Sequence, residues 1–125
     1  MMKKMLFLFF LLPSPSFSAL LCQSGKIEDV VNKEQVESVV FFASWCQSCV
    51  DSIRQSDPER DLYVAVFDNK KDASKSLLYV LKERAKKARC VFDEKNQIAK
   101  FLGVDSLPKK KSHKRVREVY LEKKL

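Results

Sequence analysis

Two cysteines separated by two residues are the part of the chain best suited to chemistry. Cys46 and Cys49 form a C-x-x-C pattern, preceded by Trp45, with Gln47 and Ser48 between them. The thiolate form of cysteine is a nucleophile and a metal ligand, and this spacing brings both sulfurs to one helical turn, where a disulfide can close. We take Cys46 as the candidate nucleophile and Cys49 as the candidate resolving thiol of a redox pair.

The residues on either side predict the elements that position this pair. The β-branched and aromatic run at 38–43 predicts a strand, and Cys49 and Ile53 recur at helical spacing after the turn. This order places Cys46 at a helix N-terminus, where unpaired backbone N–H groups and the helix dipole favour an ionised thiol. Two buried thiols or an incidental disulfide without redox function, or half of a zinc site, are the alternative interpretations.

The rest of the chain shows alternating helical and strand patterns. The 62–67 run is continuously apolar, as expected for a strand buried on both faces, and a helix between two such strands favours a right-handed parallel unit. Asp72 or Ser74 is the expected cap of the longest helix. Helices are expected at 26–34, at 49 to before Pro58, at 74–88 and at 98–102, and a further short strand at 90–92. The prediction is one α/β domain.

The middle of the chain resembles a known family. A strand followed by W-C-x-x-C and a helix, then D-x-x-x-x-I-A-K-F-L-G-V over 93–104 and a proline at 108, is similar to the thioredoxin superfamily. The likeness is to its TlpA/ResA/DsbE-like branch of exported thiol–disulfide oxidoreductases and covers 36–108. It implies a thioredoxin-like fold, a central mixed sheet flanked by helices.

The resemblance also implies a substrate-binding position. In the family a cis-proline lies beside the C-x-x-C pair and exposes a backbone edge to the substrate. Pro108 matches that proline by position, with Leu107 before it. The alternative is a trans proline that ends a loop.

Several residues depart from the family pattern. Many thioredoxins bury an acid six residues before the first cysteine, near a lysine on the next strand; Val40 and, by our alignment, Val66 stand there. Glu37 is the possible substitute proton acceptor. Gln47 and Ser48 supply neither the proline of reducing sites nor the histidine of strong oxidants, so we expect an intermediate potential.

The resemblance ends at the basic segment 109–125. Five of the seven residues at 109–115 are Lys or Arg, and such charges are costly inside a sheet buried on both faces. We therefore expect a solvated loop with a strand at 116–121, or no C-terminal hairpin, and in either case no final helix. His113, the only histidine, is expected to be a solvated tail residue.

The N-terminal residues have the pattern of an export signal. Lys3 and Lys4 precede eight apolar residues at 5–12, too few to span a bilayer, which takes about 20. A cleavage site after Ser18 predicts a signal peptide at 1–18, a domain at 19–108 and a basic segment at 109–125. An uncleaved membrane anchor is the alternative. Lipidation of Cys22 is disfavoured because Leu21, which precedes it, is not small.

Cysteine count and charge distribution set further limits. In an oxidising compartment such as the periplasm, the four cysteines allow a second disulfide between Cys22 and Cys90. The net charge of +8 comes from the two ends: 109–125 carries eight basic and two acidic residues, whereas 5–108 is neutral. We therefore expect no nucleic-acid partner.

These observations together predict an exported thiol–disulfide oxidoreductase, a reductant or isomerase-like enzyme. We expect a monomer that needs no cofactor or metal, acts on protein disulfides or thiols, and exchanges electrons with a redox partner that can be membrane-bound. The competing hypotheses are a truncated, non-catalytic thioredoxin-like protein or binding module with a basic tail, and a thiolate metal site at Cys46 and Cys49.

Overall fold

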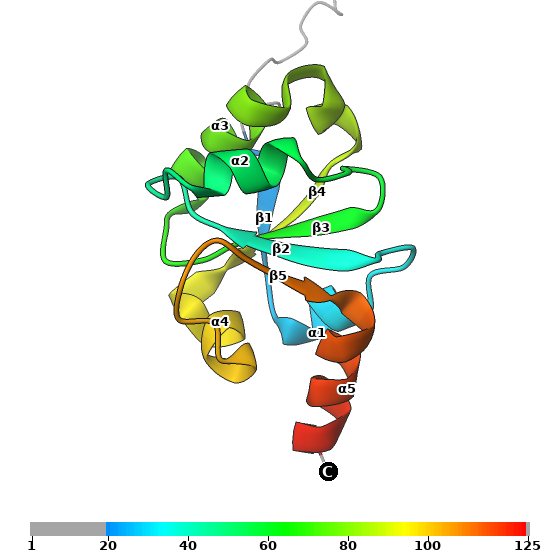
Figure 1. The fold of residues 1–125 in the computed structure, drawn as a ribbon. Coiled ribbons are helices and arrows are strands. Elements are labelled where there is room, and N and C mark those ends of the chain that lie inside the picture. Colours follow the sequence, from blue (N-terminus) through cyan, green and yellow to red (C-terminus); the bar gives the residue numbers. More distant parts are fainter. Residues whose placement is uncertain (1–19, 125) are drawn as a thin grey trace, which may run out of the picture.

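A five-stranded mixed sheet flanked by helices organises residues 20–124, the part of the chain described by the computed structural model (Figure 1). The expected signal peptide at 1–18 lies outside the described residues. The sheet order is β1-β4-β3-β2-β5; all neighbours are parallel except β2 and β5, which are antiparallel. The strands are β1 (Cys22–Gly25), β2 (Ser38–Phe42), β3 (Asp61–Ala65), β4 (Arg89–Asp93) and β5 (Lys109–Ser112). This arrangement confirms the α/β prediction and is compatible with a thioredoxin-like fold.

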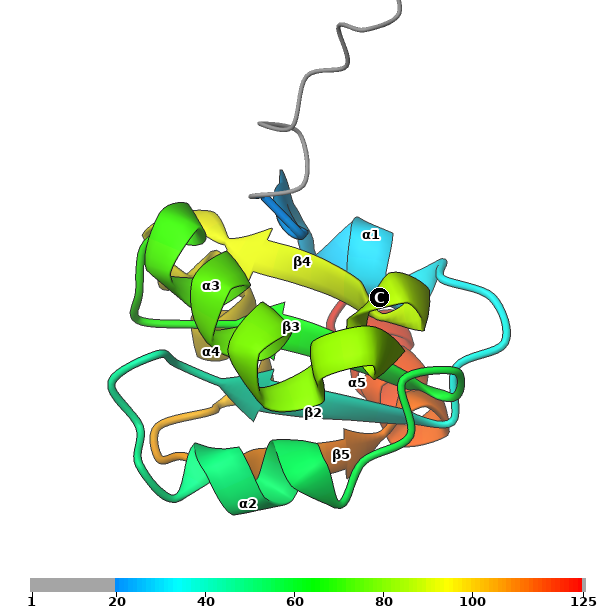
Figure 2. The same ribbon diagram turned by 90° about the horizontal axis from the view of Figure 1, so that it is seen from above.

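Helices cover both faces of the sheet. Figures 1 and 2 show α2 and α3 on one face and α1, α4 and α5 on the other. The α-helices are α1 (Ile27–Val31), α2 (Cys49–Arg54), α3 (Lys70–Leu81), α4 (Gln97–Leu102) and α5 (His113–Lys124), and the 3-10 helices are η4 (Lys82–Lys87) and η5 (Glu94–Asn96). Double coverage explains why the central strands read as continuous apolar runs rather than alternating patterns.

The core consists of two layers separated by the sheet. Val40 and Phe42 of β2 belong to the layer under α2 and α3, together with all four cysteines. Val39 and Phe41 point to the other layer, with residues of α1, α4 and α5. All four of these side chains are fully buried. Strand alternation places Cys22 and Cys90 on the face of the sheet that α2 covers, and α2 begins at Cys49, so both cysteine pairs share one layer.

The longest helix begins four residues earlier than predicted. The side chain of Asn69 accepts a hydrogen bond from the backbone N–H of Asp72 at 2.8 Å and so caps α3. Ser74, one of the two expected caps, is buried and accepts a hydrogen bond from the backbone N–H of Cys22 instead. The helix ends at Leu81 because Lys82 has a positive φ of 57°, so the predicted continuation to 88 forms η4.

The prediction for the C-terminal segment was wrong. Residues Lys109–Ser112 form β5, and His113–Lys124 form α5, the final helix that was expected to be missing. The expected strand at 116–121 is part of that helix. The lysines do not lie inside the sheet, because β5 is an edge strand. Lys110 is exposed, and Lys109 and Lys111 are only half-buried, so their ammonium groups need not lose their hydration.

His113 is buried rather than solvated, with 5% of its surface exposed. Its Nε2 lies 2.8 Å from the carbonyl oxygen of Val30 in α1. Val116, one turn further along α5, is fully buried in the layer that α1 lines. The basic segment is therefore anchored to the domain by the apolar side of α5.

A disulfide joins β1 to β4. Cys22 and Cys90 are direct register partners on these neighbouring parallel strands, and their Cα atoms lie 4.5 Å apart. Both residues are buried. The second pairing that the sequence allowed is therefore formed, and a Cys22 sulfur held in this bond is not available for lipidation.

This cross-link makes a stability prediction. The bonded cysteines are 68 residues apart, so the disulfide restricts a large loop of the unfolded chain. Cys22→Ala/Cys90→Ala should lower the free energy of unfolding by about 2–4 kcal/mol in urea titration. The matched control Cys46→Ala/Cys49→Ala opens a disulfide of sequence separation 3 and should cost clearly less. Equal losses for the two double variants would contradict this account.

Candidate active site

The Cys46–Cys49 disulfide closes the turn between β2 and α2. Cys49 is the first residue of α2, and its backbone N–H donates to the carbonyl oxygen of Cys46 at 3.1 Å. Cys46 was predicted to lie at the helix N-terminus. In the structure it lies three residues before the first residue of α2, in the turn that leads into the helix. The two sulfurs are bonded, which confirms that the C-x-x-C pair can form a disulfide.

The two sulfur-bearing residues differ in their access to solvent. Cys46 is 6% exposed, and Cys49 is 1% exposed beneath it. Cys46 lines an open groove of about 520 Å³, whereas Cys49 does not. An incoming thiol or disulfide would thus meet Cys46 first.

The groove brings together residues far apart in the sequence. Leu107 contributes to it from the segment before β5, opposite the residues of the β2–α2 turn. Its lining residues are Trp45, Cys46, Gln47, Ser48, Val50, Asp51, Arg54 and Leu107. The Leu107–Pro108 peptide bond is cis, as the resemblance implied; Pro108 itself follows the lining residues. Four of the five candidate residues of the C-x-x-C turn line one groove with Leu107, and only Cys49 does not.

Two contacts fix the turn that carries Cys46. Asp68, in the loop after β3, accepts hydrogen bonds from the backbone N–H and the hydroxyl of Ser44, the latter at 3.0 Å. The indole N–H of Trp45 donates to the carbonyl oxygen of Phe67 at 2.8 Å. Trp45 nevertheless stays 63% exposed, so its ring stands at the rim of the groove.

Sequence reasoning missed Ser44 and Asp68. They follow the ends of β2 and β3, which are parallel neighbours. Polar residues just after two adjacent parallel strands meet at the same edge of a sheet, and this signal could have pointed to the pair.

The alignment that placed Val66 at the position of the family's lysine, near Val40, is wrong. Register pairs Val40 with Tyr63 of β3, and Val40, Tyr63 and Ala65 share the layer of the cysteines. Val66 belongs to the opposite layer, so it does not face Val40. Within 20–124 the buried acidic side chains are Asp61 and Asp93, and neither lines the groove.

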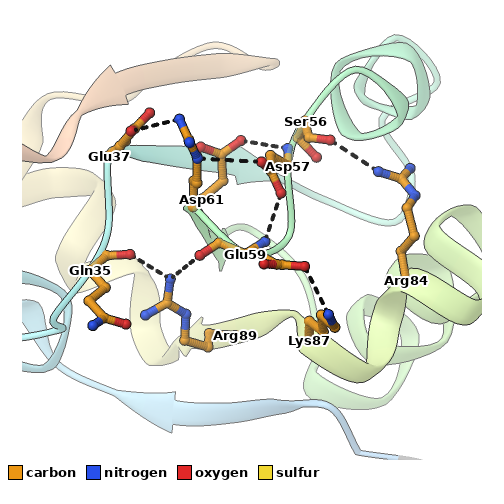
Figure 3. A network of polar contacts seen from close by, with 10 residues as sticks. Gln35, Glu37, Ser56, Asp57, Glu59, Asp61, Arg84, Lys87 and Arg89 are labelled. Atoms are coloured by element: carbon orange, nitrogen blue, oxygen red, sulfur yellow. Dashed lines mark hydrogen bonds and ion pairs between the residues drawn. The ribbon is translucent and has the colours of Figure 1, made fainter.

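Glu37 is not a substitute proton acceptor. It precedes β2, whereas Cys46 follows this strand, so the two lie at opposite ends of it. Its carboxylate pairs with Arg60 at 3.0 Å, as part of a polar network shown in Figure 3. The network joins the loops before β2 and β3 to η4 and β4 through side chains that include Arg84 and Arg89. Glu37 therefore stabilises the end of the sheet that lies far from the disulfide.

Residues 20–124 contain neither a cluster of metal-ligating side chains nor a helix that could span a membrane. No group of three or more His, Cys, Asp or Glu side chains in this range is arranged to hold a metal ion. In the same range, no helix has the length and apolar character needed to cross a bilayer.

Comparison with known proteins gives no match: no protein-family model, curated protein or solved structure is significantly similar to this chain.

Tyr63 links the layer around the disulfide to the end of α2. Its hydroxyl lies 2.5 Å from the Ser56 hydroxyl, which in turn donates to the carbonyl oxygen of Ile53. Burial raises the pKa of Tyr63 above its ordinary value of 10.0.

This raised pKa predicts a loss of stability in alkali. The stabilising effect of neutral Tyr63 is complete below pH 10.0 and is lost as pH rises through the folded-state pKa. Tyr63→Phe should cost about 1 kcal/mol near neutral pH through the lost hydrogen bond. The same variant should lose less additional stability than the parent between about pH 8 and pH 11 in urea titrations. Parallel pH profiles for the two proteins would refute the assignment.

Proposed function

We propose that this chain is a thiol–disulfide oxidoreductase of thioredoxin-like fold, acting on protein substrates through Cys46 and Cys49. The observation that carries the proposal is the disulfide itself, with Cys46 in an open groove beside Leu107 and a cis Leu107–Pro108 bond. The resemblance to TlpA/ResA/DsbE-like proteins supports the same assignment.

The exchange requires two attacks by sulfur. In the reductive direction, the Cys46 thiolate attacks a substrate disulfide, forms a mixed disulfide and releases one substrate thiolate. The Cys49 thiolate then attacks the Cys46 sulfur, which forms the Cys46–Cys49 disulfide and releases the second substrate thiolate. Two electrons pass from the protein dithiol to the substrate, and protons from solvent neutralise the released thiolates.

The difference in exposure supports these two roles. A nucleophile must reach an external disulfide, and Cys46 lines the groove. A resolving thiol needs only to reach the Cys46 sulfur, and Cys49 is buried directly behind it. Leu107 and Pro108 would contact the substrate chain on the opposite side of the groove, with Trp45 at its rim.

An extracytoplasmic location fits this chemistry. Both disulfides would persist in an oxidising compartment such as the periplasm, and the basic and apolar pattern at 1–12 supports export. Repeated reduction of substrates would require a redox partner that returns two electrons to Cys46 and Cys49. We favour a reductant or isomerase-like role because Gln47 and Ser48 lack the histidine of strong oxidants.

Substitution of each cysteine should give a different result. With reduced protein and a disulfide-linked peptide, Cys46→Ser should abolish peptide reduction because the attacking sulfur is lost. Cys49→Ser should still attack but cannot resolve the product, so a mixed disulfide through Cys46 should accumulate and appear as an added peptide mass in mass spectrometry.

The control is the second disulfide. Cys22→Ser/Cys90→Ser should retain peptide reduction at a temperature at which circular dichroism shows it folded, because neither residue lines the groove. Undiminished reduction by Cys46→Ser would refute the proposed function. A cooperatively folded protein without any exchange activity would instead favour the binding-module hypothesis.

A further inference from the structure

Three consecutive lysines follow the cis-proline of the candidate site. Lys109, Lys110 and Lys111 form most of β5, and we call them the lysine strand. β5 pairs only with β2, so its other side is the edge of the sheet. None of the three takes part in an ion pair within residues 20–124. The lysine strand is therefore a concentration of uncompensated positive charge next to the groove.

The strand register decides which lysine shares the face of the disulfide. Lys110 is the direct partner of Val40 across the antiparallel pair, and directly opposed residues point to the same side of a sheet. Val40 lies in the layer that contains Cys46 and Cys49. Lys109 and Lys111 oppose Phe41 and Val39, which face the other layer.

Lys110 is also close enough to the groove for its charge to act there. It follows Leu107 by three residues, a separation of at most about 10 Å along an extended chain. This length is similar to the Debye length of about 8–10 Å at physiological salt. The groove itself carries one negative and one positive group, Asp51 and Arg54, which are exposed and 3.9 Å apart, so the net positive charge beside it comes from the lysine strand. A substrate segment in the groove would thus meet net positive charge.

We propose that the lysine strand, mainly through Lys110, selects substrates whose reactive cysteine is flanked by acidic residues. This inference rests on the proposed function and adds the substrate class to it. An acidic segment that extends from the groove along the edge of β5 would place its carboxylates near the Lys110 ammonium group. Such attraction increases the rate of encounter and weakens as salt rises.

The test compares disulfide peptides that differ only in charge. Three cyclic peptides carry Glu, Gln or Lys beside otherwise identical cysteines, and each reacts with the reduced full-length protein. Trp45, the only tryptophan, reports oxidation of the adjacent cysteines by its fluorescence. At low salt, the Glu peptide should react about two- to fivefold faster than the Gln peptide, and the Lys peptide more slowly than both. The differences should shrink at about 0.5 M salt.

Two matched variants localise the effect. Lys110→Glu should reverse the order of the Glu and Lys peptides. Lys114→Glu makes the same change of net charge at an exposed position of α5, beyond the end of β5 that pairs with the start of β2, and it should keep the parent order. Lys110→Gln, which only removes the charge, should abolish the preference without a reversal.

An uncharged small disulfide separates the two levels of the proposal. If hydroxyethyl disulfide reacts equally with parent and Lys110→Glu proteins while the three peptides show no charge preference, the inference is overturned and the oxidoreductase function stands. If neither the peptides nor the small disulfide react, both fail. Equal peptide rates together with salt-sensitive sedimentation on phosphatidylglycerol vesicles would assign the lysine strand to an anionic membrane surface instead.

Discussion

The fully buried strand β2 is the constraint on which the rest of the structure depends. Val39 to Phe42 are buried on both faces, so the backbone N–H and C=O groups of the strand need protein partners on both sides. β3 provides one set and β5 the other. This requirement explains why a segment of three lysines forms a strand: its backbone completes β2, while its position at the edge leaves Lys110 exposed and Lys109 and Lys111 only half-buried.

The same strand carries the candidate site at its end. The chain leaves β2, is held to the loop after β3 by the contacts of Ser44 with Asp68 and of Trp45 with Phe67, and enters α2 at Cys49. Antiparallel pairing brings the start of β5 to this same end, which places Leu107 across the groove. The polar network of Figure 3 occupies the other end, so the candidate groove and the ion pairs of this network lie at opposite ends of β2.

The charged groups near the disulfide are solvent-exposed side chains at the protein surface. The layer beneath Cys46 and Cys49 is apolar apart from the Tyr63–Ser56 hydrogen bond, Ser74 and, at the start of β3, the buried Asp61. Formal charge enters the region from solvent-exposed groups instead: Arg54, Asp51 and Lys110. Exposed charges act mainly on encounter and selection, and they are screened by salt. A buried acid would act on proton transfer.

Hydrophobic periodicity and turn signals are local, so the sequence was sufficient to predict the strand–turn–helix unit around Cys46 and Cys49. It also indicated the proline at 108, through resemblance. Long-range packing was needed to establish the edge position of β5, the helical state of 113–124, the burial of His113 and the Cys22–Cys90 bond. Each of these depends on which strand lies beside which, and a one-dimensional pattern does not contain that information. The lysines at 109–111 were taken to exclude a strand within the sheet. The free-energy cost of desolvating them depends on whether the strand is central or at the edge, and residue type alone does not reveal this position.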